Sequence, residues 1–201
     1  MTLRLPFHTP ADLPRAATAV REVLAAHGVC AFPTETFYGL GCNPHDARAV
    51  ERIFELKGRP GEKALPVVAA TMDQVDALAV VEEAWQRRLA RVWPAPLTVV
   101  VPVRVPMAAV GSTVAIRITA HRLLRSLLAR VGPLTATSAN RAGGPPAGTV
   151  TELSLEVDLV LDGGDTTGVL ATTLLDLTAS PAVVLRTGSW LPPREWGVKT
   201  A

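Results

Sequence analysis

The sequence predicts a mixed α/β fold in which helices pack against a single twisted sheet. Amphipathic helical segments alternate with short apolar strands, and the alternation is too uneven for a purely parallel sheet. With 48% hydrophobic and 19% charged residues, the 201 residues can bury the core of one domain spanning 1–201. Its last stretch, 191–201, is expected to fray.

Five segments have apolar residues at helical spacing together with a start or stop signal. Asp12 and Asp46 are placed to cap the first two at their N-termini. Gly28 and Gly58 supply residues that end them. The predicted helices are 12–27, 46–56, 71–79, 82–93 and 121–132.

Short apolar runs rich in β-branched residues separate these helices and are typical of strands. Loops rich in Gly and Pro are expected at 33–46 and 138–148, and loops beside strands often carry function. The predicted strands are 29–32, 65–69, 93–103, 113–118, 134–137, 157–161, 172–178 and 182–186.

The composition excludes several classes of protein. A net charge of +2 and a pI near 8.8 suit an anionic ligand better than a long nucleic-acid duplex. Four Trp, one Tyr and four Phe are too few for a platform of stacked bases. The sequence begins without a signal-peptide pattern and has no apolar run of membrane-spanning length, so a cytoplasmic protein without membrane contact is expected.

The sequence predicts no metal bound by protein ligands. Cys30 and Cys42 form no CxxC pair, and the four histidines do not fall at metal-ligand spacing. Both cysteines are interpreted as small packed side chains in or near strands, in preference to a disulfide or a nucleophile.

Cations gather where the second predicted helix ends. Only three lysines occur in the chain, and Lys57 and Lys63 lie on either side of Arg59. Helical spacing places Lys57 on the face that packs into the protein, where its charge needs a partner. The cluster is therefore interpreted as a polyphosphate site, although cations also favour an exposed helix C-terminus.

Two loops present hydroxyl and amide groups. In "TATSAN", Ser138 and Asn140 follow an apolar strand and can hold phosphate or ribose oxygens, or else close a simple turn. In "PTETFYGLG", Thr34, Thr36 and Tyr38 offer hydroxyls beside glycines that let a ligand approach the backbone, and a plain glycine turn is the alternative.

Two arginines interrupt predicted strands. Arg117 and Arg186 either lie on exposed strand faces or line a cleft together with the lysine cluster. No G-x-x-x-x-G-K-[ST] loop is present, and "GLGCNP" lacks the third glycine of the dinucleotide fingerprint. Any nucleotide is therefore expected to be held by dispersed side chains.

These stretches, taken in order, resemble the YrdC family of threonylcarbamoyl-AMP synthases. The resemblance rests on "FPTETFYGLGCNP", "LKGRPGEKALPV", "WPAPLTVVVP", "STVAIRIT", "TSAN" and "VVLRTGS" and runs from about 31 to 189. It implies a twisted α/β domain with a large basic cavity. The family's K-x-R and S-x-N signature falls on Lys57, Arg59, Ser138 and Asn140.

The resemblance implies condensation of L-threonine, bicarbonate or CO2, and ATP into L-threonylcarbamoyl-adenylate, with release of pyrophosphate. Magnesium would be bound through the phosphates, and a separate transferase complex would pass the product to tRNA beside the anticodon. Lys57 is the expected cation nearest the reacting groups. By the family pattern, the nucleotide contacts are Arg59, Lys63, Thr113, Ser138 and Arg186, and the L-threonine contacts are Thr36, Arg117 and Thr172.

The sequence departs from the longer family members at the implied threonine side of the pocket. Val68 replaces a histidine, and 171–173 read Ala-Thr-Thr in place of Glu-Ser-Thr. The chain is also expected to be the short form, without an additional C-terminal domain. Two alternatives remain: a non-catalytic module binding double-stranded RNA or tRNA, and a carbamoyl transferase of the hydrogenase-maturation type, for which the chain is short.

Overall fold

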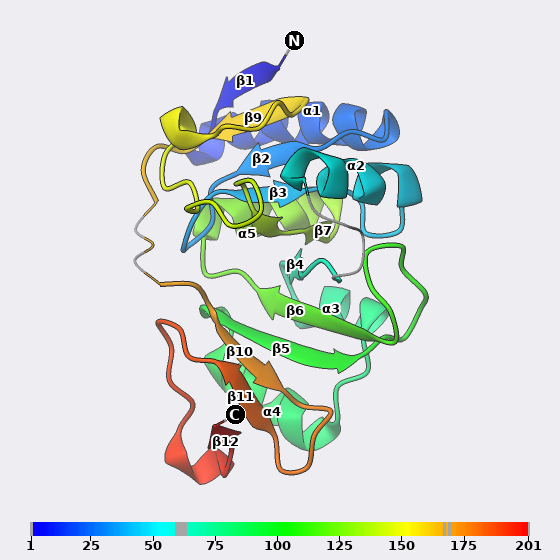
Figure 1. Ribbon diagram of the computed structural model, residues 1–201, viewed down its shortest axis with the longest axis vertical. Helices are drawn as coiled ribbons and strands as arrows, with labels where there is room; N and C mark the ends of the chain where they lie inside the picture. The colour runs from blue at the N-terminus through cyan, green and yellow to red at the C-terminus, as the bar shows by residue number, and fades with distance from the viewer. Residues whose placement is uncertain (1, 59–63, 167, 169, 201) are drawn as a thin grey trace.

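The protein, described here from a computed structural model, forms two mixed sheets, which corrects the prediction of a single sheet (Figure 1). The described residues are 2–58, 64–166, 168 and 170–200. The first sheet has the order β1 (Leu3–Pro6), β9 (Leu159–Asp162), β2 (Cys30–Phe32), β3 (Gly39–Gly41) and β8 (Thr137–Ser138). The second has the order β12 (Lys199–Thr200), β11 (Val183–Arg186), β10 (Thr173–Asp176), β5 (Leu97–Pro102), β6 (Thr113–Ile118), β4 (Val67–Ala69) and β7 (Leu134–Thr135).

The two sheets share one extended segment, 134–138. Its first part, β7, pairs antiparallel with β4, and its second part, β8, pairs antiparallel with β3. Between them, the Ala136 amide donates to the Pro66 carbonyl. The sequence predicts 134–137 as one strand, because an apolar run indicates a strand without indicating which neighbours it pairs with.

The helices begin and end close to the predicted positions. They are α1 (Leu13–Ala25), α2 (Ala47–Lys57), α3 (Met72–Leu78), α4 (Glu83–Val92) and α5 (Arg122–Val131), with 3-10 turns at Pro10–Asp12, Val150–Glu152 and Arg194–Trp196. The Asp46 carboxylate accepts from the amides of Arg48 and Ala49, as predicted for a cap. Gly58, at φ 63°, ends α2 in the left-handed region. No helix in the described residues is long and apolar enough to cross a membrane.

The buried apolar side chains form three clusters, each of which lies between helices and one face of a sheet. One joins α1 and α5 to a face of the first sheet and includes Phe32 and Leu127. A second joins α2 to the opposite face, through Ile53 and Leu40. The third packs α3 and α4 against the second sheet and includes Leu89. Figure 1 shows β1, β9, β2 and β3 in the upper half of the molecule and β6, β5, β10 and β11 in the lower half.

Three strands were not expected from the sequence. β3 has the sequence Gly-Leu-Gly and lies within the predicted loop 33–46, while β1 and β12 are short edge strands. The expectation that 191–201 frays is also not met for its described residues. They form a 3-10 turn and β12, which pairs parallel with β11, and the Trp196 side chain is buried against Trp85 and Trp190.

The two cysteines are packed thiols, as predicted. Cys30 lies in β2 and Cys42 directly follows β3, and both are free and fully buried. Burial raises the pKa of both thiols, that of Cys42 to about 11, so neither is a ready thiolate.

Candidate active site

A cavity of about 680 Å³ is lined by residues of both sheets. The first sheet contributes β8 and the loop before β3, and the second contributes β5, β6, β10 and β11. The polar side chains that line it include Thr36, Arg117, Ser138, Asn140, Thr172 and Arg186.

Strand alternation directs one face of the second sheet into this cavity. Along β6, Val114, Ile116 and Ile118 pack in the core beneath α3 and α4. The residues between them, Ala115 and Arg117, line the cavity on the opposite face. Of the two interpretations of Arg117, the structure thus supports the cleft over an exposed strand face.

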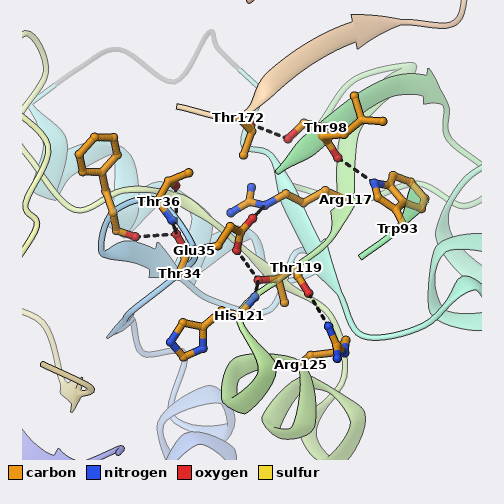
Figure 2. A network of polar contacts seen from close by, with 12 residues as sticks. Thr34, Glu35, Thr36, Trp93, Thr98, Arg117, Thr119, His121, Arg125 and Thr172 are labelled. Carbon is orange, nitrogen blue, oxygen red and sulfur yellow. Dashed lines mark hydrogen bonds and ion pairs between the residues drawn. The ribbon is translucent and has the colours of Figure 1, made fainter. Parts of the chain in front are cut away.

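Arg117 forms a buried ion pair with Glu35, which comes from the loop between β2 and β3 (Figure 2). The Arg117 Nε donates to Glu35 Oε1 at 2.9 Å, and the Thr119 hydroxyl donates to Glu35 Oε2 at 2.5 Å. The two charged side chains are 6% and 9% exposed. Burial raises the pKa of the Glu35 carboxyl, but the Arg117 charge and the Thr119 hydrogen bond outweigh it and hold that pKa below its ordinary value.

A second guanidinium, that of Arg186 at the end of β11, faces the same cavity. It donates to the backbone carbonyl of Thr172 at 3.1 Å and to the Thr172 hydroxyl at 3.3 Å. Burial lowers the Arg186 pKa, and the nearby charge of Arg117 lowers it further. Two like charges held within range of each other favour an anionic ligand between them.

The loop before β3 is held in shape by its own threonines. The Thr34 hydroxyl donates to the Phe37 carbonyl at 2.7 Å and accepts from the Thr36 amide at 3.1 Å. The Tyr38 hydroxyl donates to the Gly164 carbonyl and accepts from the Gly163 amide, which ties this loop to the chain after β9. The phenol of Tyr38 therefore has a structural role, and Thr34 and Thr36 carry the hydroxyls beside the cavity.

Lys57 braces the other wall of the cavity. Its side chain is buried on the packed face of α2, as predicted, and its ammonium donates to the backbone carbonyls of Ser138 at 2.5 Å and Asn140 at 2.8 Å. The Asn140 amide nitrogen donates to the carbonyls of Arg141 and Gly144. These two bonds fix the orientation of the amide, and its buried oxygen has no partner among the described residues.

The structure brings together six of the predicted site residues: Thr36, Arg117, Ser138, Asn140, Thr172 and Arg186. Lys57 lies behind the Ser138–Asn140 turn and is not among the described lining residues. Thr113, at the start of β6, is also absent from that lining. Arg59 and Lys63 lie outside the described residues.

The two departures from the family pattern lie in different surroundings. Val68 is buried in the apolar cluster with the α5 leucines and does not line the described cavity. Ala171 and Thr172 do line it, and the Thr172 hydroxyl is 2.8 Å from that of Thr98. Substitution at 171–172 therefore changes the cavity wall directly, whereas Val68 acts through packing.

Sequence reasoning missed Glu35, Thr98 and Thr119. Glu35 lies between Thr34 and Thr36, which line the cavity, and its carboxylate turns toward Arg117 instead (Figure 2). A strand arginine that is buried needs a counter-charge, and this was the available signal. It did not identify Glu35, because 82 positions separate the partners.

Comparison with known proteins identifies the family. A model of the Sua5, YciO and YrdC family, described as "Telomere recombination", matches residues 22–188. The chain belongs to this family. The resemblance predicted from the sequence is thereby confirmed.

Named members of the Sua5/YciO/YrdC family are similar over most of this chain. A threonylcarbamoyl-AMP synthase of Pyrococcus abyssi is 40% identical over 82% of the chain and 51% of that protein. One of Pseudomonas aeruginosa is 44% identical over 74% of the chain and 83% of that protein. The chain thus spans about half the archaeal relative and most of the bacterial one.

Two solved structures are similar in fold to this chain over most of its length. P. abyssi Sua5 complexed with L-threonine superposes with a TM-score of 0.82 at 35% identity, covering 97% of this chain and 59% of that one. E. coli YciO superposes with a TM-score of 0.79 over 94% of this chain and 96% of that one. At 24% identity, the likeness to YciO shows the fold alone.

Proposed function

We propose that the chain is a threonylcarbamoyl-AMP synthase whose substrates meet in the cavity between the two sheets. Relatives at 40% and 44% identity carry that name, which agrees with the function predicted from the sequence. The reaction joins L-threonine, bicarbonate or CO2, and ATP into L-threonylcarbamoyl-adenylate and releases pyrophosphate. It is the first step of threonylcarbamoyladenosine modification of tRNA.

The observation that carries the proposal is the convergence of two guanidinium groups on one cavity. Arg117 comes from β6 and Arg186 from β11, and Ser138 and Asn140 reach the same space from the first sheet. Because residues of both sheets build this basic cavity, we treat 1–201 as one functional domain. Guanidinium groups present planar sets of N–H donors, which bind carboxylates and phosphates well.

In this proposal Arg117 binds the carboxylate of L-threonine. Its Nε–H donates to Glu35. Within the described residues the guanidinium makes no other hydrogen bond, so its two terminal nitrogens can donate to a ligand in the cavity. Thr36 and Thr172 lie beside the same cavity and are the proposed contacts for the rest of the amino acid. A solved structure of the P. abyssi relative is described as complexed with L-threonine.

The nucleotide is proposed to lie toward Arg186, Ser138 and Asn140. Arg186 supplies a charge for phosphate, and the Ser138–Asn140 turn is held by Lys57. The unpartnered Asn140 oxygen is an acceptor, so it suits a ligand N–H or hydroxyl group in place of a phosphate oxygen. Arg59, Lys63 and Thr113 stay predictions as further nucleotide contacts.

The chemistry explains the need for cations. The amine of threonine attacks CO2 and loses a proton to give a carbamate; a carbamate oxygen then bonds to the α-phosphorus of ATP as the bond to pyrophosphate breaks. Both reactants are anionic, so fixed positive charge lowers the repulsion and holds them in line. Mg²⁺ is proposed to arrive on the phosphates of ATP, and the described residues hold no group of three metal-ligating side chains.

The proposed setting is the cytoplasm, where a separate tRNA-modifying transferase complex takes up the product. The direct test is pyrophosphate release from ATP by the purified chain, with L-threonine and bicarbonate each omitted in turn. Release that requires both supports the proposal. Pyrophosphate release that does not depend on L-threonine contradicts the proposal. Tight, salt-dependent tRNA binding without pyrophosphate release would instead indicate an RNA-binding module.

A further inference from the structure

One polar network crosses from the first sheet to the second beside the cavity. Glu35 belongs to the loop before β3, whereas Arg117 lies in β6 and Thr119 directly after it. The network continues along the chain, because the Thr119 hydroxyl accepts from the His121 amide at 3.2 Å and the His121 ring caps α5 at the Leu124 amide. Figure 2 shows Glu35 between Arg117 and Thr119.

We propose that Glu35 is a positioning residue that aims Arg117 at the amino-acid carboxylate. The inference rests on the proposed function, and it adds a residue and a mechanism to it. By holding the Nε edge of the guanidinium, Glu35 leaves the two terminal nitrogens, which form a planar fork, to face the cavity. A bidentate carboxylate contact needs that fork to be fixed in direction.

Glu35 itself is unsuited to bind the substrate. Each carboxylate oxygen already accepts a hydrogen bond, one from Arg117 and one from Thr119, and its side chain is 9% exposed. It is also absent from the described cavity lining, although its neighbours Thr34 and Thr36 are part of it. Its contribution therefore passes through Arg117.

Thr119 completes the arrangement and supplies a clean test. Its hydroxyl restrains the second Glu35 oxygen, so the carboxylate cannot rotate away from Arg117 without losing a charge-assisted hydrogen bond. Replacing Thr119 by Val removes this hydroxyl at nearly constant shape and leaves every charge in place. It also removes the acceptor of the His121 amide, which the Thr119→Ser variant keeps. An effect of T119V on threonine use thus reports geometry and not net charge.

The experiment compares wild type, Glu35→Gln, Thr119→Val and Thr119→Ser by pyrophosphate release. KM for L-threonine is measured at saturating ATP, KM for ATP at saturating threonine, and folding is checked by thermal unfolding. We expect KM for threonine to rise about 10- to 100-fold in E35Q and about 3- to 10-fold in T119V, with KM for ATP within about twofold. T119S, which keeps the hydroxyl, is expected to restore the threonine KM to near the wild-type value.

Three results overturn the inference while leaving the proposed function intact. The first is a threonine KM that does not change in folded T119V. The second is a lower threonine KM in E35Q, which would mean that the Glu35 charge merely opposes the substrate carboxylate. The third is an equal increase in both KM values, since it indicates general disruption. If E35Q does not fold, the T119V and T119S pair decides. A wild-type chain without threonine-dependent release refutes the proposed function instead.

Discussion

Three buried charged side chains illustrate how individual residues shape this site. Glu35 and Arg117 neutralise each other, whereas Lys57 is satisfied by backbone carbonyls of the Ser138–Asn140 turn. Leaving any of them without partners in the interior would cost several kcal/mol. Each therefore fixes the position of the groups around it, and these groups include parts of the cavity wall.

Replacement of Lys57 by Met tests the role of its ammonium. The variant keeps an apolar stem but removes the ammonium donor from the Ser138 and Asn140 carbonyls, of which the Ser138 carbonyl keeps the Asn140 amide as a donor. We therefore expect the free energy of unfolding to fall by about 2 kcal/mol. A domain with about 5–15 kcal/mol of stability remains folded after such a loss. Urea unfolding measures the first effect, and pyrophosphate release is expected to fall at least about tenfold because the turn loses its anchor.

Lys199→Met serves as the matched control, since Lys199 is exposed on the edge strand β12. Its unfolding midpoint and turnover are expected to equal those of the wild type. Undiminished turnover in the Lys57 variant would remove Lys57 from the proposed site.

At the scale of elements, close approach of neighbouring strands explains why the last residue of β3 is a glycine. β3 pairs with β2 on one side and β8 on the other, and a Cβ atom at Gly41 would lie 2.4 Å from the Phe32 ring and 2.6 Å from the Thr135 carbonyl. The strand therefore accommodates no side chain at this position. A Gly-Leu-Gly strand has low strand propensity, and packing overrides it here.

The change Gly41→Ala is accordingly expected to destabilise the protein by about 2 kcal/mol or more, through overpacking against Phe32 and Thr135. Gly111→Ala provides the comparison, because a Cβ there meets nothing within 4 Å and its φ is not positive. Chemical denaturation of both variants measures the difference. Similar midpoints for the two would show that β3 can shift to accept the methyl group.

Much of the element pattern was predictable, and much of the pairing was not. Helices such as α2 carry their own signals, an Asp46 cap and a Gly58 stop. The change of sheet at Ala136 carries no local signal, because it depends on one hydrogen bond to the Pro66 carbonyl and on partner strands far along the chain. Likewise Arg117 and Arg186 were recognisable as unusual, whereas Glu35 became evident only from the fold.

At the scale of the whole molecule, the C-terminal segment adds β12 to the edge of the second sheet and packs against α4. Trp196 packs against Trp85 of α4 and Trp190, and Arg88 stacks over the Trp85 ring. The same region touches the cavity wall, because the Thr173 hydroxyl donates to the Trp190 carbonyl and the Ser189 amide donates to Ala171. These contacts hold the residues on either side of Thr172, and Arg186 in turn donates to the Thr172 carbonyl.

Substitution of Trp196 by Ala is expected to lower the free energy of unfolding by about 3 kcal/mol, because it empties a buried aromatic site. Differential scanning calorimetry measures the loss, and Leu191→Ala, at a side chain 69% exposed, is the control with little expected change. An unchanged melting temperature for the Trp196 variant would restore the original expectation that this end frays.

The extended segment 134–138 hydrogen-bonds to both sheets, and the Glu35–Arg117 ion pair joins them a second time beside the cavity. Ser138 lies at the end of this segment, in β8. Arg186 lies on β11, separated from β7 by four intervening strands. A molecule that reaches from Ser138 to Arg186 consequently cross-links strands of both sheets.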